Sequence, residues 1–594
     1  MKNPGYFSIF IRMTIVAGVI STGLLSSLTA AFTTSRPFAQ RPIARFISNH
    51  IPPASNHIHT TATTMSNSNN RLTNDTVEHV DSDELPSWML AERTRILNKS
   101  QKSCKINSSK TGGSIVYWMQ RDVRTVDNWA LLLASHFAET SGLPLRVLYT
   151  LPPPPKNART SPDEDNLPPT LAEMPMTERH GSFLIGGLEC VYQELKQQNV
   201  PLQVLLPESD ETVGTTVDEW AADVEAQLVV CDMDPLRQFR GWHELQALPL
   251  FQKRKLPYIQ VDAHNVVPVW HASPKREYGA RTLRSKINKL IGEFTQEFPE
   301  FQGNQHLSQA QKDGLWKNHD KVFDRKRYEA YLQMDKKVPK CDWATPGTEG
   351  GMKQFQFFVE EGGLKKYDTK RNDPNEPEAC SDMAYWLNFG HVGFQTLLLQ
   401  VKKLNKYASG VASFVEEGVV RKELSDNFVY YTPNDYDTLE AAADWAKETL
   451  NAHTSDKREY VYSLEELQDG KSHDELWNAA QLQVVREGRM HGFLRMYWAK
   501  KILEWTETPE IALRTTQYLN DRFALDGKSK YSLLFSMAIF ISLRCYLLLC
   551  HPPSTRIKIQ TDLLVRIGVF LVSTIKVRLT NQERFWCLCM AKHL

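Results

Sequence analysis

The chain has 594 residues, 41% of them hydrophobic, and a formal net charge of +1 at pH 7. This length allows two or three globular domains, and the near-zero charge neither favours nor excludes nucleic acid, since a local basic groove can lie within it. The nine cysteines form no C-x-x-C pair or His/Cys cluster, which argues against a zinc site and indicates free thiols in a reducing compartment. Neither a GxxxxGK(S/T) phosphate loop nor a strand-linked GxGxxG motif is present.

The first 74 residues contain no Asp or Glu. Lys2 and Arg12 precede an apolar stretch over 15–31 that ends in small residues, which is the layout of a signal peptide. Residues 33–71 are rich in Ser, Thr, Asn and Arg, and the two segments together resemble the bipartite plastid leaders of algae. We therefore expect 1–74 to be a targeting leader and the protein to be located in a plastid. The alternative is initiation at Met65, with a nuclear or cytoplasmic location.

Residues 75–110 are expected to be a disordered linker, and strand-like runs then alternate with helical patterns over 111–272. This alternation predicts a doubly wound α/β domain with a parallel sheet. The predicted strands are 114–119, 145–151, 202–206, 226–232 and 258–261, and the predicted helices are 128–138, 183–197 and 217–226.

After a connector over 273–330, the periodic patterns of 331–528 are those of helices. The second part of the fold is therefore predicted to be an all-α domain. Its strongest helical periodicities lie at 398–407, 411–430, 437–450 and 476–504.

Residues 529–594 differ in composition from everything before them. They contain two acidic residues, Asp562 and Glu583, and two apolar runs at 531–550 and 563–575. The first run is about long enough to cross a bilayer, although Arg544 interrupts it. We interpret the segment as an aberrant tail, such as a translated intron; membrane association is expected only if the tail is genuine.

The stretch 489–505 (RMHGFLRMYWAKKILEW) contains two tryptophans seven residues apart. On a helix, Trp498 and Trp505 would lie on one face, about 10.5 Å apart along the axis. Arg495 lies on the same face. This spacing by itself favours a packed helix core over a functional arrangement.

Several stretches, however, resemble the class II cyclobutane pyrimidine dimer photolyases of the photolyase/cryptochrome family almost residue for residue. The resemblance covers roughly residues 114–528 and implies a light-driven DNA-repair lyase with FAD as its cofactor. The matching motifs are 116–122 (VYWMQRD), 127–131 (DNWAL), 260–270 (QVDAHNVVPVW), 275–282 (KREYGART), 371–374 (RNDP), 421–428 (RKELSDNF), 476–481 (LWNAAQ) and 489–505.

In this family FAD lies in the helical domain, and the resemblance assigns flavin contacts to seven residues of this chain. Asn520 matches the asparagine that faces flavin N5, while Arg495 and Asp526 match a salt-bridged pair beside the flavin. A reduced anionic flavin requires such a cation with a fixed partner. The remaining contacts are assigned to Tyr367, Cys380, Ser381 and Met383.

The resemblance also assigns the substrate side and the photoreduction path. Glu417, with Asn372 and Met496, would face the dimer, and the acid would bind a thymine carbonyl that becomes anionic. Trp498, Trp477 and Trp505 match the tryptophans that photoreduce the flavin, with Trp498 nearest to it. The resemblance implies that the partner is UV-damaged DNA. It also implies that the protein is a monomer and needs no metal. A second antenna chromophore in the α/β domain is a family expectation, of unknown identity.

Three departures from the family bear on these expectations. Residues 383–390 read MAYWLNFG where the family typically has LSPxLHFG. Gly418 follows Glu417 where the family prefers Leu, at a cost of about 1 kcal/mol relative to Ala in a helix. After Lys528 the chain lacks the family segment with two tryptophans that clamp the flipped-out dimer. The alternatives to repair are a cryptochrome-like photoreceptor and a DNA-binding or membrane-associated protein that is inactive in repair.

Overall fold

The computed structural model describes residues 71–104, 112–316 and 322–527. The predicted leader lies outside these ranges up to residue 70, and the apolar tail lies outside them completely. Within the described ranges, no helix has the length and apolar character needed to span a membrane.

In the described part of the chain, six strands form one sheet in the order β1-β6-β5-β2-β3-β4. Strands β2 to β6 are parallel, and only β1 is antiparallel to its neighbour β6. From β2 the chain first adds β3 and β4 on one side, and it then returns to add β5 and β6 on the other side. This is the doubly wound arrangement. The strands are β1 (Thr94–Ile96), β2 (Ser114–Met119), β3 (Leu145–Thr150), β4 (Leu202–Leu205), β5 (Ala226–Asp232) and β6 (Tyr258–Val261).

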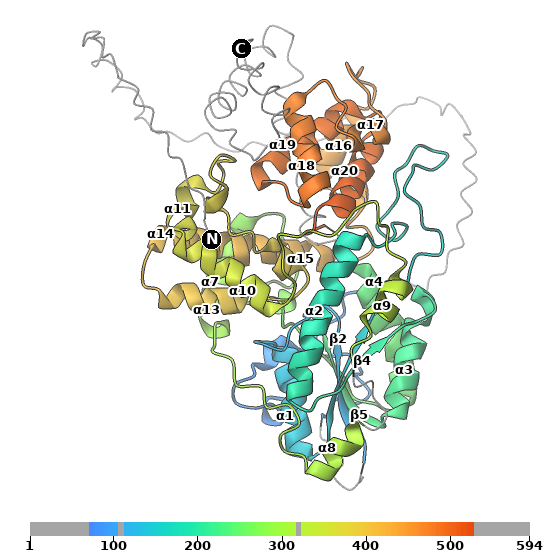
Figure 1. Cartoon of the computed structure of the whole chain (residues 1–594), viewed down its shortest axis with the longest axis vertical. Helices are drawn as coiled ribbons and strands as arrows, with labels where there is room; N and C mark the ends of the chain where they lie inside the picture. Colours follow the sequence, from blue (N-terminus) through green and yellow to red (C-terminus); the bar gives the residue numbers. More distant parts are fainter. Residues whose placement is uncertain (1–70, 105–111, 317–321, 528–594) are drawn as a thin grey trace, which may run out of the picture. The chain divides into compact units, whose positions relative to one another are not determined.

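Helices cover both faces of this sheet (Figure 1). Tyr117 of β2 points into a core shared with α1 and α2, whereas Trp118 points into a second core shared with α3 and the π-helix η4. Because both faces are covered, β2 is buried along its whole length, as is typical of parallel sheets. These helices are α1 (Trp129–Ser141), α2 (Glu178–Gln197), α3 (Val213–Asp223), α4 (Arg237–Arg240), η4 (Gly241–Ala247), α5 (Leu248–Lys253) and α6 (Val269–Ala272).

The disordered linker expected over 75–110 is wrong for the described residues 75–104. This segment forms the 3-10 turns η1 (Ser82–Glu84) and η2 (Ala91–Arg93), followed by β1 at the sheet edge. Arg93 is buried, and its guanidinium donates hydrogen bonds to the carbonyls of Asp262 and Val266. A strand of three residues is too short to produce a periodic pattern in the sequence. The hydrogen bonds of Arg93 are to residues distant in sequence, so they produce no local sequence pattern either.

The helical domain was predicted correctly in kind, but several helix boundaries differ from the expected ones. Helix α13 ends at Lys403 rather than at 407, and α16 begins at Asp444 rather than at 437. Its elements, with those of the connector, are α7 (Ala280–Phe294), α8 (Gln309–Leu315), α9 (Arg325–Leu332), α10 (Thr348–Glu360), α11 (Gly363–Lys370), η5 (Pro377–Ala379), α12 (Ala384–Asn388), α13 (Phe394–Lys403), α14 (Ala408–Val415), η6 (Glu416–Arg421), α15 (Lys422–Tyr431), η7 (Leu439–Ala441), α16 (Asp444–Ala452), α17 (Leu464–Gln468), α18 (Glu475–Glu487), α19 (Gly492–Trp505) and α20 (Pro509–Phe523).

The periodic stretch 476–504 forms two helices, α18 and α19, instead of one. Gly488 ends α18 in the left-handed region, at φ 75°, where a residue without a side chain is favoured. His491 then begins α19 by accepting a hydrogen bond from the backbone N–H of Phe493. The chain reverses between the two helices, which brings residues of α18 against α19.

A buried ion pair and a buried carboxyl group attach helix α15 to the loops of the α/β domain. Arg121 forms an ion pair with Asp426 at 2.7 Å, and both side chains are buried. Glu423 accepts a hydrogen bond from the backbone N–H of Val266 at 2.6 Å. Burial raises the pKa of Glu423 to about 8, so this carboxyl is protonated at neutral pH.

Candidate functional site

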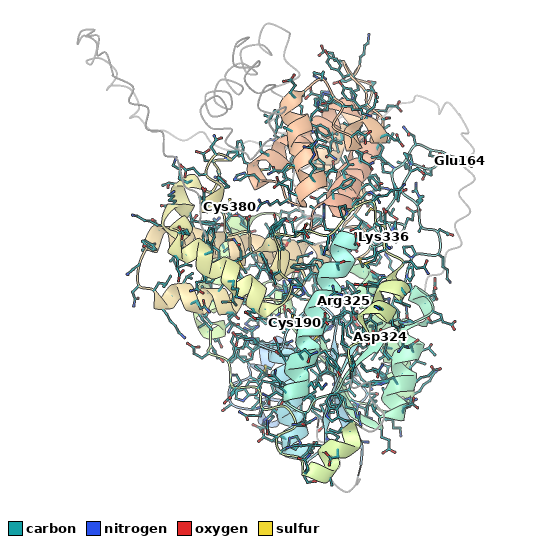
Figure 2. The ribbon with its side chains drawn as sticks, in the orientation of Figure 1. Glu164, Cys190, Asp324, Arg325, Lys336 and Cys380 are labelled. Carbon is teal, nitrogen blue, oxygen red and sulfur yellow. The ribbon has the colours of Figure 1, made fainter. Side chains whose placement is uncertain are left out.

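Arg371, just after α11, contacts three of the residues that are predicted to bind flavin or substrate. Its guanidinium forms an ion pair with Glu417 at 3.0 Å and lies 5.7 Å from the ring centre of Tyr367. Its carbonyl oxygen lies 3.5 Å from the sulfur of Cys380, which is among the residues labelled in Figure 2. Burial raises the pKa of Cys380 to about 12, so the thiol stays protonated and is not a nucleophile.

His491 connects this group to helix α19, and sequence reasoning gave it no role. Its Nε2 lies 3.5 Å from Cys380 Sγ, and its Nδ1 accepts from the backbone N–H of Phe493 at 3.2 Å. Burial lowers the pKa of His491, which favours the neutral ring. With Nδ1 as an acceptor, the ring hydrogen is on Nε2, the nitrogen nearest to Cys380. The sequence signal that could have identified His491 is its position at the start of a predicted helix, within the family motif at 489–505.

Arg495 and Asp526 form the fork that the resemblance implies. Two parallel hydrogen bonds of 3.0 Å join the guanidinium to the carboxylate, and the side chains are 12% and 13% exposed. Burial opposes the charge on Arg495, but Asp526 outweighs it and raises the pKa of the guanidinium. The pair is therefore a fixed, partly buried cation with a bidentate partner.

Asp382 is a second acidic group near this fork that the sequence reasoning missed. It adopts the left-handed conformation, at φ 55°, and its carboxylate lies 3.5 Å from Arg489. Burial raises its pKa to about 6, with Asp526 adding to the effect and Arg489 opposing it. The residue lies beside the segment that departs from the family pattern, where Asn388 donates to the carbonyl of Gly527 at 3.2 Å.

The three predicted tryptophans are in contact, but in an order that helix spacing did not predict. Trp477 of α18 lies between the two tryptophans of α19: its ring centre is 6.3 Å from that of Trp498 and 5.6 Å from that of Trp505. The first pair is stacked at 8°, and the second is edge-on. Trp477 Nε1 donates to the carbonyl of Trp498 at 2.9 Å. All three rings are buried and form a continuous aromatic path.

Of the remaining predicted residues, those assigned to the substrate side are exposed and those assigned to the flavin are mostly buried. Asn372 is exposed and Met496 is 41% exposed, as a surface that meets a substrate requires. Asn520 is 4% exposed and donates to Asp521 at 3.0 Å. Met383 is 1% exposed within the helical core, so its side chain packs there, while its backbone N–H donates to the hydroxyl of Ser381.

This donor set fits a flavin dinucleotide. An anionic reduced flavin needs a cation held in place and an amide within a dry environment, and the Arg495–Asp526 fork and the buried Asn520 provide both. The neighbouring face of α19 exposes Phe493 at 39% and Met496 at 41%, which is the type of apolar surface on which aromatic rings pack.

Comparison with known proteins identifies the family. The family model described as DNA photolyase matches residues 115–302. A deoxyribodipyrimidine photo-lyase of Potorous tridactylus is 44% identical over 420 residues, covering 70% of this chain and 71% of that protein. One of Oryza sativa subsp. japonica is 40% identical over 429 residues, covering 70% and 78%. The structure of a Synechocystis cryptochrome is similar in fold, with a TM-score of 0.54 and 14% identity over 73% of this chain and 83% of that one.

The fold and the relatives agree with each other. The structural neighbour is similar in fold over most of both chains, and the curated relatives are similar in sequence over more than two thirds of their length. This chain therefore belongs to the DNA photolyase family.

Proposed function

We propose that this protein repairs cyclobutane pyrimidine dimers in UV-damaged DNA by light-driven electron transfer, with FAD held in its helical domain. The main support is the Arg495–Asp526 ion pair, which lies in the same helical domain as the stacked rings of Trp498 and Trp477. The chain that contains this arrangement belongs to the DNA photolyase family. Reduced FAD supplies, under light, the one electron that opens the dimer and is then returned.

The protein's own groups would bind, orient and shield the reactants. The fork formed by Arg495 and Asp526 would hold the flavin ring, and the amide of Asn520 would approach its N5 edge. Tyr367 and the segment from Cys380 to Met383 would contact the rest of the dinucleotide. These assignments rest on the residue-by-residue resemblance and on the donor chemistry described above.

On the substrate side, Glu417 would act together with Arg371 rather than alone. The two side chains are paired at 3.0 Å and remain 35% and 24% exposed, so both are accessible to a ligand. A guanidinium held by a carboxylate is suited to a carbonyl oxygen that gains negative charge. Asn372 and Met496, both exposed, would complete the surface for the extruded bases.

The decisive experiment is to purify residues 71–528, which keep β1 and Arg93, with a family-type C-terminal segment and to measure bound FAD and repair. We expect about one FAD per chain, and light-dependent loss of dimers from a UV-treated oligonucleotide. A folded but colourless protein would contradict the flavin assignment. A yellow protein without repair in light would favour the photoreceptor alternative.

Three further proposals concern properties that the fold leaves open. A second, light-collecting chromophore would bind the α/β domain and would add an absorption band to the flavin spectrum of the purified protein. The protein would act as a monomer, which light scattering tests. Residues 1–74 would direct a fused fluorescent protein to the plastid, whereas a nuclear or cytoplasmic signal would favour initiation at Met65.

A further inference from the structure

Helix α2 extends from the sheet of the α/β domain to the helical domain (Figure 1), and Arg179 and His180 lie near its N-terminal end. Arg179 is 1% exposed, and its guanidinium donates only to main-chain carbonyls. These carbonyls belong to Pro339, Val484, Val485, Arg486 and Phe523. An arginine has five N–H donors, so every donor of this side chain is used.

Most of the carbonyls that Arg179 binds lie at the C-terminal ends of two helices. Three of them are in the last turn of α18, and the carbonyl of Phe523 belongs to the last residue of α20. Carbonyls at a helix end carry a partial negative charge, which suits a buried cation. A single side chain of the α/β domain thus holds the ends of α18 and α20 together.

His180 adds a contact to the residue that follows α20. Its Nε2 lies 2.9 Å from the carbonyl oxygen of Ala524, and its Nδ1 lies 2.6 Å from the hydroxyl of Thr177, the N-cap residue of α2. A carbonyl can only accept, so in the neutral ring Nε2 carries the hydrogen and Nδ1 accepts from the hydroxyl. His180 is 2% exposed, so water does not compete for this hydrogen bond.

The two helix ends lead to the two halves of the Arg495–Asp526 fork. Asp526 is the third residue after the end of α20, and the chain turns at Gly488 from α18 toward α19, which carries Arg495. The backbone N–H of Leu525 donates to the carbonyl of Gly488 at 2.8 Å, which joins the two segments. The meeting of guanidinium and carboxylate therefore depends on contacts that begin in the α/β domain.

We propose that Arg179 and His180 are positioning residues of the flavin site. They act through the backbone and do not touch the flavin. By holding the ends of α18 and α20, they set the geometry at which the carboxylate of Asp526 meets the guanidinium of Arg495. This inference rests on the proposed function, in which that fork lies beside the flavin. When the carboxylate is displaced, the guanidinium is no longer fixed, and the reduced anionic flavin loses more stabilisation than the oxidised flavin.

A purely structural role for the two residues would have a different consequence. If they only stabilised the fold, their loss would lower the melting temperature and weaken the binding of oxidised and reduced FAD equally. The ratio of the two dissociation constants therefore separates the two roles. The same ratio determines the midpoint potential of bound FAD, which provides an independent measurement.

The experiment measures both dissociation constants and the midpoint potential in the full chain. His180→Phe keeps a ring but removes the donor to Ala524. We expect reduced FAD to bind about tenfold more weakly relative to oxidised FAD, the effect of weakening one charge-assisted hydrogen bond, and the potential to become more negative. Arg179→Lys keeps the charge but has three donors instead of five, and should act in the same direction. His180→Gln has an amide N–H donor and should restore the ratio.

Arg93→Lys is the matched control. Arg93 is also buried, and its guanidinium also makes five hydrogen bonds, one of them to Gln395 of α13 in the helical domain. None of these bonds is to α18, to α20 or to the segment that carries Asp526. Arg93→Lys should therefore lower the melting temperature and leave the ratio of the dissociation constants unchanged.

An unchanged ratio in His180→Phe would overturn this inference and leave the proposed function intact. A changed ratio in Arg93→Lys would also overturn it, because general destabilisation would then account for the effect. A wild-type chain that binds no FAD would overturn the proposed function and this inference with it. His180→Phe leaves Arg179 unchanged, so it decides the question even if Arg179→Lys does not fold.

Discussion

Trp498 is one end of the aromatic path, and the role in photoreduction that we propose for it can be tested separately from repair. Trp498→Phe should block photoreduction of oxidised FAD but leave dimer repair largely intact when the flavin is reduced chemically. The reason is that, in the proposed function, the tryptophans would deliver electrons to the flavin, whereas repair would take electrons from it. Trp242→Phe, at a buried tryptophan of the α/β domain, is the matched control. Equal loss of both activities in Trp498→Phe would contradict the assignment.

Glu417 is expected to act on the dimer and not on the flavin. Glu417→Ala should lower the number of dimers repaired per absorbed photon while the FAD spectrum and content stay unchanged. Because the ion pair with Arg371 is partly exposed, its loss should cost no more than about 1 kcal/mol of stability. Glu416→Ala, which removes a carboxylate paired with Arg284 at 2.6 Å, is the control. An unaltered quantum yield in Glu417→Ala would remove Glu417 from the site.

At the scale of elements, the π-helical turn η6 depends on Gly418. A Cβ at this position would lie 1.8 Å from Cε2 of Phe394, so the glycine allows a close approach of two helices. Gly418→Ala should lower the melting temperature, because overpacking of about 1–3 kcal/mol outweighs a gain of about 1 kcal/mol in helix propensity. Gly292→Ala in α7, where a Cβ meets nothing within 4 Å, should instead raise it. A higher melting temperature for Gly418→Ala than for Gly292→Ala would contradict this close packing of Gly418 against Phe394.

Glu423 makes the attachment of α15 to the α/β domain sensitive to pH. Its pKa is raised from an ordinary value of 4.5 to about 8, so the folded protein binds a proton that the unfolded chain releases. Stability from this group is complete below pH 4.5 and is lost as the pH rises toward 8. Glu423→Gln should therefore flatten the decline of melting temperature over this range. A variant whose melting curve follows the wild type at every pH would show that Glu423 is ionised in the fold.

At the scale of the whole molecule, we predict that the segment after Lys528 limits repair, because it lacks the two tryptophans expected from the family resemblance. Base flipping needs aromatic stacking, worth about 1–3 kcal/mol per base, so loss of two clamping tryptophans should weaken lesion binding by roughly 10²- to 10⁴-fold. Binding of dimer-containing DNA should be compared between the 594-residue chain and a form with the family-type ending after Lys528. Equal affinities would contradict this prediction.

The sequence predicted most of the α/β domain because its signals are local. The runs at 114–119, 226–232 and 258–261 coincide with β2, β5 and β6, since a buried strand is a short apolar segment between polar turns. Asp382 and His491 were missed for the opposite reason. Each is a single polar residue whose importance depends on partners distant in sequence, and even the N-cap position of His491 does not reveal those partners.

By itself, the sequence determined the two-domain architecture, the family resemblance and the tryptophans to examine. Only the tertiary structure decided that Trp477 lies between Trp498 and Trp505, and that Arg179 meets the ends of α18 and α20. Periodicity specifies which face of one helix is apolar, but not which face of another helix meets it. That choice depends on where the chain turns, here at Gly488, and on how the side chains of separate segments fill the space between them.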